Sequence, residues 1–238
     1  MKKIGIIGGL SWESTIEYYR IMNKSVNEKL GGLHSAKIIL NSFDFSIIEE
    51  LQRNEQWGKI SDILISTAQN LINCGAEAIL IATNTLHKLA PIVQNNINVP
   101  ILHIADATAE EILKRNYKKV LLLGTKYTMQ EEFYKQKLEN QYNIRVEVPA
   151  KWEQKLINSI IFEELCRGIK SEHAQNAILK IIDKSKFNGA EAVVLGCTEL
   201  PNLIKKANLP LLNTAEIHSK FAVEYALRQD LKLKRSIA

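Results

Sequence analysis

The residues best suited to chemistry follow two stretches of the chain that repeat each other. Residues 75–89 read GAEAILIATNTLHKL and residues 189–203 read GAEAVVLGCTELPNL, an offset of 189 − 75 = 114 with no gap. The superposition pairs three polar residues of each stretch: Thr83 with Cys197, Asn84 with Thr198, and Thr85 with Glu199. Each apolar run predicts a strand buried on both faces, and its polar continuation marks the carboxyl end of that strand. Open α/β sheets bind ligands at such ends, so we expect the two polar clusters to form two halves of one site.

Cys197 has the sequence setting of a reactive thiol. It is followed by Thr198 and Glu199, and by Pro201 in what is predicted to be the first turn of a helix. A thiol at a helix N-terminus has its pKa lowered from about 8.5, which suits a nucleophile or a general base. A small thiol packed in the core is the alternative. The polar residues that follow favour the functional interpretation.

The cluster Thr83-Asn84-Thr85 predicts an anion-binding loop. Hydroxyl groups, an amide and the free backbone N–H groups of a helix start would bind a carboxylate. Simple helix capping explains Asn84 equally well. His87, one turn later, is either a surface histidine or a candidate proton carrier or substrate contact.

The elements that must position these residues alternate between apolar strands and amphipathic helices. Eight strands are expected, near residues 3–9, 37–40, 79–81, 99–102, 119–123, 144–148, 193–195 and 209–212. Matched segments of the two halves are offset by 110 to 116 residues. We therefore predict an α/β fold of two pseudo-symmetric domains, each a parallel four-stranded sheet flanked by helices, with the active site in the cleft between them. The expected domains are residues 1–98 with 214–238, and residues 99–213.

Composition restricts the partners of the chain. The net charge is +5, but the lysines are spread along the sequence and no basic patch with interleaved aromatic residues predicts a nucleic-acid partner. No apolar run reaches the ~18 residues that a membrane-spanning helix needs. Three cysteines without metal-ligand spacing predict no metal site and favour a reducing, cytoplasmic compartment. Of these, Cys74 and Cys166 lie in helical patterns and are predicted to serve packing.

The sequence has neither a GxGxxG fingerprint nor a GxxxxGK[ST] loop, so we predict no cofactor.

Four motifs together resemble the aspartate/glutamate racemase family. They are GIIGGLSWEST (residues 5–15), ATNTLHK (82–88), LLLGTKYT (121–128) and GCTELP (196–201), and they occur in this order over nearly the whole chain. The resemblance implies a cofactor-independent racemase that acts as a homodimer on a small-molecule amino acid, aspartate or glutamate. In the family, two cysteines on opposite sides of the substrate α-carbon remove and return its proton.

Transferred to this chain, the resemblance implies Cys197 and Thr83 as the catalytic pair. It assigns contacts with the α-carboxylate to five motif positions: Asn84, Thr85, Thr125, Thr128 and Thr198. Ser11 and Glu199 are further predicted substrate-binding residues. Some family members bind the side-chain carboxylate through an arginine after the second strand, and here Gln52 and Arg53, slightly later in the chain, are the predicted substitutes.

The chain departs from the family pattern at Thr83, where the family has its first cysteine. A hydroxyl is a far weaker acid than a thiol, so Thr83 is a poor base unless a neighbour activates it. Three activities stay open: racemisation that favours the L enantiomer, decarboxylation or isomerisation with a single cysteine, and amino-acid binding without catalysis. The intact GCTE setting of Cys197 favours racemisation.

Overall fold

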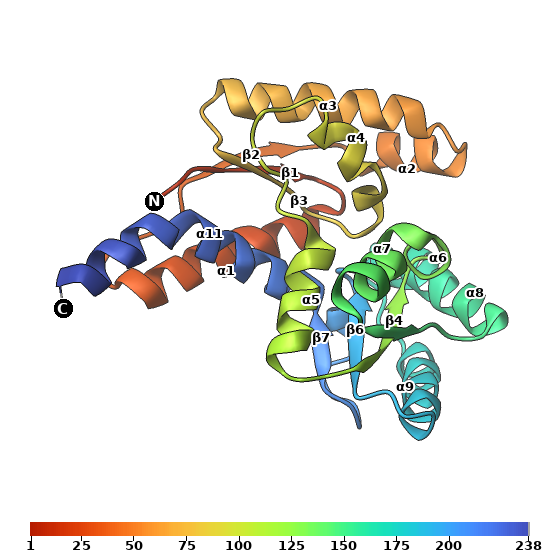
Figure 1. The fold of residues 1–238 in the computed structure, drawn as a ribbon. Helices are drawn as coiled ribbons and strands as arrows, with labels where there is room; N and C mark the ends of the chain where they lie inside the picture. Colours follow the sequence, from red (N-terminus) through yellow and green to blue (C-terminus); the bar gives the residue numbers. More distant parts are fainter. Residues whose placement is uncertain (238) are drawn as a thin grey trace. The chain divides into compact units, whose positions relative to one another are not determined.

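A computed structural model describes residues 1–237, with side chains up to residue 228. Strands and helices alternate along the chain (Figure 1). The strands are β1 (Ile4–Gly8), β2 (Ile38–Ser42), β3 (Ala78–Ile81), β4 (Lys119–Gly124), β5 (Arg145–Glu147), β6 (Ala192–Gly196) and β7 (Leu211–Asn213). The helices are α1 (Trp12–Leu30), α2 (Phe45–Arg53), α3 (Trp57–Asn73), α4 (Ala90–Gln94), α5 (Ile104–Lys114), α6 (Lys126–Gln130), α7 (Glu132–Gln136), α8 (Lys151–Ser159), α9 (Glu172–Phe187), α10 (Leu200–Leu203) and α11 (Thr214–Ile237). Short helical turns add η1 (Thr85–Leu89), η2 (Lys137–Gln141), η3 (Ile160–Glu164) and η4 (Leu165–Arg167).

The chain divides into two compact units. The first holds residues 1–103 and the chain from residue 218 onward, and the second holds residues 104–217. The first segment of the first unit ends 103 − 98 = 5 residues later than predicted. Its second segment begins 218 − 214 = 4 residues later than predicted. Helix α11 begins in the second unit at Thr214 and continues in the first. Residue 238, the end of the first predicted domain, lies outside the described residues.

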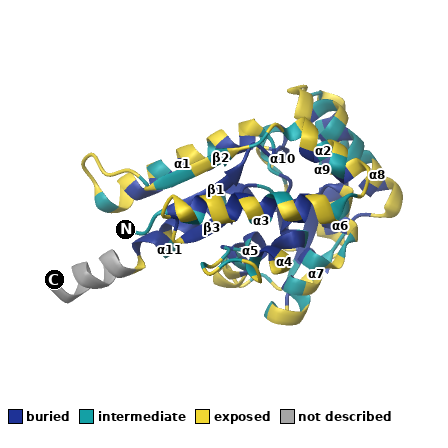
Figure 2. Ribbon diagram, turned by 90° about the horizontal axis from the view of Figure 1, so that it is seen from above, coloured by how far each residue is buried: buried dark blue, intermediate teal, exposed yellow. Residues whose placement is uncertain are grey.

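The first unit is built on a parallel sheet with the strand order β2-β1-β3. Every residue of β1 and β3 is buried, because both strands have helices on both faces. Figure 1 shows α3 on one face of this sheet and α1 with α11 on the other. Figure 2 shows the burial: β1 and β3 lie inside, and the helices expose their outer faces.

The predicted fourth strand of this first sheet is reduced to a single bridge between Ile101 and Ile79. Two hydrogen bonds flank it, from the Ile79 N–H to the Pro100 carbonyl (2.9 Å) and from the Leu102 N–H to the Ile79 carbonyl (2.8 Å). Pro100 precedes the start of α5 at Ile104. The matching segment of the second unit, Pro210 followed by α11 at Thr214, has the same spacing and forms β7. The proline and the nearby helix start therefore do not account for the shorter pairing in the first unit.

The second unit is built on a four-stranded parallel sheet with the order β5-β4-β6-β7. Residues on alternate sides of β4 and β6 enter two cores, Leu121 and Val193 under α8 and α9, and Leu122 and Val194 under α5. The order matches that of the first unit, in which β2, β1, β3 and the bridge at Ile101 occupy the same places. The predicted fold class, two parallel sheets flanked by helices, is confirmed. Within the described part of the chain, no helix is long and apolar enough to cross a membrane.

A tight turn after β1 brings the chain to the start of α1. Gly9 has φ +71°, and a Cβ placed there would lie 2.2 Å from the backbone nitrogen of Phe43. The Gly9 N–H donates to the Thr15 hydroxyl at 2.8 Å, which fixes the turn against the first turn of α1. Only glycine fits a position with both this dihedral angle and this backbone contact.

We predict that Gly9→Ala destabilises the protein far more than Gly31→Ala. Both glycines have positive φ, +71° and +77°, where a non-glycine residue costs about 1–3 kcal/mol in backbone strain at either site. Around Gly31 no atom lies within 4 Å of the added Cβ, whereas at Gly9 the backbone must move. Urea unfolding of the two variants measures the difference, and equal losses of unfolding free energy would contradict this account of the turn.

Candidate functional site

The predicted site residues lie at the carboxyl ends of the strands, in both units. In the first unit, Ser11 follows β1, Gln52 lies on the helix after β2, and Thr83 to Thr85 follow β3. In the second unit, Thr125 and Thr128 follow β4, and Cys197 to Glu199 follow β6. Parallel pairing of β1 with β3 and of β4 with β6 brings the residues of each unit to one sheet edge.

Cys197 is a buried thiol, with 9% of its surface exposed, immediately after the last residue of β6. Its pKa is raised, first by burial, which disfavours the thiolate, and further by the negative charge of Glu199. Hydrogen bonds from the backbone N–H groups of Glu199 and Leu200 to the sulfur act in the opposite direction and are outweighed. The predicted lowering of the pKa by a helix N-terminus is therefore wrong. The helix, α10, has only four residues, and burial dominates.

Glu199 controls the charge near the thiol. Its side chain is buried (4% exposed) and accepts a hydrogen bond from the Asn202 amide at 3.4 Å. With a raised pKa, Cys197 carries its proton at neutral pH and is ready to act as an acid. To act as a base it must first lose that proton.

The other two cysteines do not serve packing as predicted. Cys74 ends α3 and Cys166 lies in η4, and both residues are exposed. A helical pattern does not by itself show which face a residue occupies, which is why the sequence misplaced them.

Thr125 and Thr128 form the cap at the start of α6. The Thr125 hydroxyl accepts from the Thr128 N–H at 3.4 Å and lies 3.3 Å from the Thr128 hydroxyl. Thr128 is completely buried, and its side chain packs against Gly124 and Gly196, where any Cβ would lie 3.1 Å from it. The two paired glycines let this threonine close the ends of β4 and β6. The buried Thr128 side chain therefore supports this loop, and its hydroxyl is not exposed to solvent.

The Thr83 loop makes a sharp bend after β3. The Thr83 N–H donates to the Ile81 carbonyl at 2.9 Å, and Thr83 itself is half-buried. The next two residues, Asn84 and Thr85, are buried, with 2% and 7% of their surfaces exposed. Gln52 is also buried, at 6%. The loop thus gathers an amide and two hydroxyl groups beside the end of a buried strand.

Ser11 is a strained residue at the N-terminus of α1. Its φ is +62°, in a region that L-residues other than glycine rarely adopt. Strain of this kind concentrates at functional sites, where the surrounding structure maintains it. This observation, which the sequence could not supply, adds to the case for Ser11 as a site residue.

His87 belongs to a buried cluster of histidines in the first unit. It is fully buried, with ring centroids 4.6 Å from His103 and 5.5 Å from His218. Burial, reinforced by the other two histidines, lowers the pKa of His87 well below its ordinary value. Burial likewise lowers the pKa of His218 to about 4. The sequence missed His218 and its partner Tyr18, because both lie on apolar faces of helical patterns and give no polar signal.

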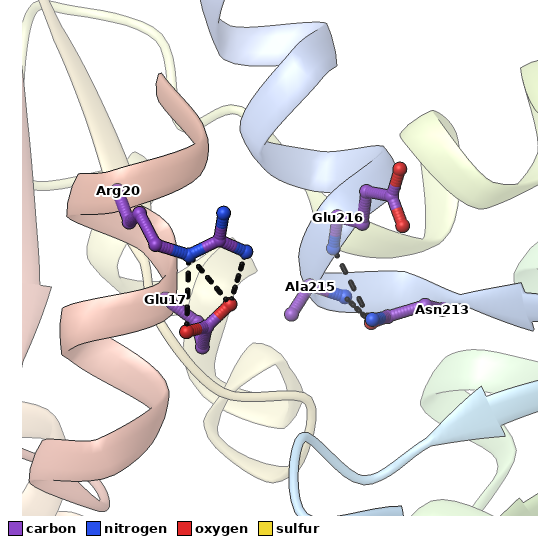
Figure 3. Close-up of polar contacts among 5 residues, drawn as sticks. All are labelled: Glu17, Arg20, Asn213, Ala215 and Glu216. Atoms are coloured by element: carbon purple, nitrogen blue, oxygen red, sulfur yellow. Dashed lines mark hydrogen bonds and ion pairs between the residues drawn. The ribbon is translucent and has the colours of Figure 1, made fainter. Parts of the chain in front are cut away.

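A separate cap fixes the carboxyl end of β7. Asn213 accepts hydrogen bonds through Oδ1 from the N–H groups of Ala215 (3.1 Å) and Glu216 (3.3 Å), at the start of α11. Figure 3 shows this cap, and also the ion pair of Glu17 with Arg20 on α1 at 2.6 Å. Nearby, the buried Thr214 hydroxyl donates to the Leu195 carbonyl at 2.8 Å, which joins the cap to β6. Among the residues that the structure describes, no cluster of His, Cys, Asp and Glu side chains could hold a metal ion.

Comparison with known proteins identifies relatives over most of the chain. The family model for Asp/Glu/hydantoin racemases matches residues 7–222. A Yersinia pestis protein provisionally described as an Asp/Glu racemase has a similar structure, with 44% identity, a TM-score of 0.90, and coverage of 95% of this chain and 100% of that one. An aspartate racemase homologue from Pyrococcus horikoshii OT3 is 42% identical, with a TM-score of 0.82 and coverage of 95% and 99%. The broad specificity amino-acid racemase RacX of Bacillus subtilis is 25% identical over 162 residues, 67% of this chain and 69% of RacX.

We predict that Glu199→Gln lowers the pKa of the Cys197 thiol, because it removes the carboxylate that opposes the thiolate. The rate of alkylation by iodoacetamide, measured against pH in a Cys74→Ser, Cys166→Ser background, reports this pKa. Glu172→Gln, which removes an exposed carboxylate from the first turn of α9, is the matched control and should leave the profile in place. An unchanged or raised midpoint in Glu199→Gln would exclude Glu199 as the controlling charge.

We also predict that stability decreases as the pH falls below about 6.5. His87 and His218 have folded-state pKa values below those of the unfolded chain, so the unfolded state binds more protons there. Stability is complete above the unfolded pKa and is lost below it, by up to about 1.4 kcal/mol per pH unit for each histidine.

Urea unfolding between pH 7.5 and pH 5.5 measures this loss. The variant His218→Gln should show a flatter dependence, whereas His34→Gln, at an exposed position, should keep the dependence of the parent. Identical slopes in the two variants would rule out the buried histidines as its source.

Proposed function

Because the chain belongs to the Asp/Glu/hydantoin racemase family, we propose that it racemises an acidic amino acid, aspartate or glutamate, without a cofactor. The observation that carries the proposal is the place of Cys197: a buried thiol at the carboxyl end of β6, immediately after the last residue of that strand. The equivalent place in the first unit, after β3, is occupied by Thr83.

In the proposed mechanism, Cys197 as thiolate removes the α-proton of the L enantiomer, and Thr83 returns a proton to the other face of the carbanion. A thiol with a raised pKa is less often ionised, but its thiolate is a stronger base once formed. The carbanion places negative charge on the α-carboxylate. The hydrogen-bond donors of Asn84, Thr85 and Thr198 would stabilise this charge.

The two faces are proposed to be unequal. Thr83 has a hydroxyl where the family pattern has a thiol, and a hydroxyl is a weak acid and a weaker partner in proton transfer. Deprotonation and reprotonation on the Cys197 face should therefore be faster than transfer on the Thr83 face. The α-hydrogen of the L enantiomer would then exchange with solvent faster than the molecule inverts.

The departure at Thr83 also supports an alternative. With one thiol, the same site could protonate a carbanion on a single face, as a decarboxylase or isomerase would, or bind an amino acid without reaction. A decarboxylase consumes its substrate and releases carbon dioxide, and a binding protein exchanges no α-hydrogen.

We further propose the substrate of the protein and the residue that contacts its side chain. Aspartate and glutamate are the substrates to test first, because the named relatives include an aspartate racemase homologue, and RacX extends the test to other amino acids. Gln52, a buried amide on α2, is the proposed contact for the side-chain carboxylate. The homodimer and the cytoplasmic location remain predictions.

We predict that, in D2O, the α-proton NMR signal of L-aspartate or L-glutamate disappears faster than that of the D enantiomer. Cys197→Ala should abolish the exchange, because it removes the only proposed base on that face. Thr83→Cys should extend exchange to the D enantiomer, because it supplies a thiol on the other face.

Absence of exchange with any acidic amino acid, in both the parent and Thr83→Cys, would refute the racemase proposal. Release of carbon dioxide in the same samples would favour the decarboxylase. Saturable binding with no chemical change would favour the binding protein.

A further inference from the structure

The side chain of His87 holds the carbonyl group of Thr83. Nδ1 of His87 lies 2.7 Å from the Thr83 carbonyl oxygen. Because a carbonyl oxygen can only accept, this hydrogen bond requires the tautomer with the hydrogen on Nδ1, which donates it. In an α-helix this oxygen would receive the backbone N–H of residue 87. That N–H instead donates to the Asn84 carbonyl at 3.1 Å, so the histidine ring supplies the donor that the backbone does not.

The cysteine half of the repeat holds the equivalent carbonyl in another way. Position 87 + 114 = 201 is Pro201, which has no N–H and no side-chain donor. There, the Cys197 carbonyl receives the backbone N–H of Leu200 at 3.2 Å. The two halves thus fix the same atom of the same turn, and the threonine half uses a side chain to do it.

The His87 ring is itself held by several elements of the first unit. It has no exposed surface and packs edge-on against the rings of His103 and His218. His218 is fixed in turn by the Tyr18 hydroxyl at 3.0 Å from Nδ1 and by the Leu102 carbonyl at 2.6 Å from Nε2. Contacts from α1, from α11 and from the segment before α5 therefore set the direction of the Nδ1–H bond.

The orientation of the Thr83 peptide matters because its hydroxyl is one rotatable bond from the backbone. A proton donor must lie within hydrogen-bond reach of the atom that it serves. A displacement of about 1 Å can cost about a hundredfold in rate. A hydroxyl is already a weak partner in proton transfer, so its placement is the contribution that the surrounding protein can make.

We propose that His87 is a positioning residue for Thr83: its hydrogen bond to the Thr83 carbonyl holds the loop so that the side chain at position 83 meets the substrate α-carbon. This role rests on the proposed racemase function and deepens it. His87 itself transfers no proton to substrate, in keeping with its complete burial. The sequence-based suggestion of His87 as a proton carrier or substrate contact is replaced by this one.

The test measures two rates with L-aspartate in D2O, α-hydrogen exchange by NMR and inversion to D-aspartate by chiral chromatography. Their ratio isolates the face served by position 83. The parent and the Thr83→Cys variant, in which inversion should be easier to detect, each receive three changes at His87. His87→Asn keeps a donor close to the place of Nδ1, His87→Gln is a matched amide with a different reach, and His87→Leu has no donor.

The expected result is a ratio of inversion to exchange that falls at least about tenfold in His87→Leu and His87→Gln. In His87→Asn the ratio should stay within about threefold of its parent, since the donor is restored. Exchange of the L enantiomer should fall less than inversion in all three, because Cys197 serves that face and only the loop contacts of Asn84 and Thr85 are shared. Circular dichroism melting verifies that each variant is folded. If His87→Leu does not fold, the difference in this ratio between His87→Asn and His87→Gln tests the positioning role.

An unchanged ratio in His87→Leu, or an Asn variant as impaired as the Leu variant, would overturn the positioning role. Parallel loss of exchange and inversion would do the same, because it indicates general damage to the fold. These outcomes differ from failure of the racemase proposal, in which the parent and Thr83→Cys show no exchange at all and the role assigned to His87 falls with it.

Discussion

Burial of β3 and β6 on both faces is the constraint on which the rest of the structure depends. Every residue of these strands is buried, so polar side chains can follow only where each strand ends. Parallel pairing with β1 and β4 then gathers the polar ends of neighbouring strands at one edge of each sheet. The two stretches that repeat at an offset of 114 residues make the same arrangement twice, with Thr83 after β3 and Cys197 after β6.

Burial also sets the chemistry of the thiol. Two backbone N–H groups stabilise the Cys197 thiolate, but loss of water and the charge of Glu199 oppose it more strongly. A free thiol in this setting holds its proton until a substrate or a higher pH removes it. Thr83 differs from Cys197 because its hydroxyl is a far weaker acid than a thiol, so its contribution depends on being held in place. The buried ring of His87 and its hydrogen bond to the loop provide that hold.

The alternation of strands and helices, the two-sheet fold and the carboxyl-end location of the polar clusters could all be predicted, because apolar periodicity and the repeat record them directly. The pKa of Cys197 could not, since the sequence shows the neighbouring helix start but not the depth of burial that outweighs it. The exposure of Cys74 and Cys166 could not be predicted either, because a helical pattern does not show whether a given residue faces the core or the solvent. The strained φ of Ser11 and the contacts of Tyr18 and His218 depend on residues far apart in sequence, which no local pattern encodes. The reduction of the fourth strand of the first sheet to a single bridge could not be predicted either, because Pro100 and α5 have the same spacing as Pro210 and α11, which enclose β7.

The most direct test of two unlike groups acting on opposite faces is a crystal structure of Cys197→Ser with L-aspartate bound. The racemase proposal predicts that the Thr83 hydroxyl and the serine hydroxyl at position 197 lie on opposite sides of the substrate α-carbon, each within about 3.5 Å of it. An amino acid held with both groups on one side, or with Thr83 turned away from the α-carbon, would contradict it.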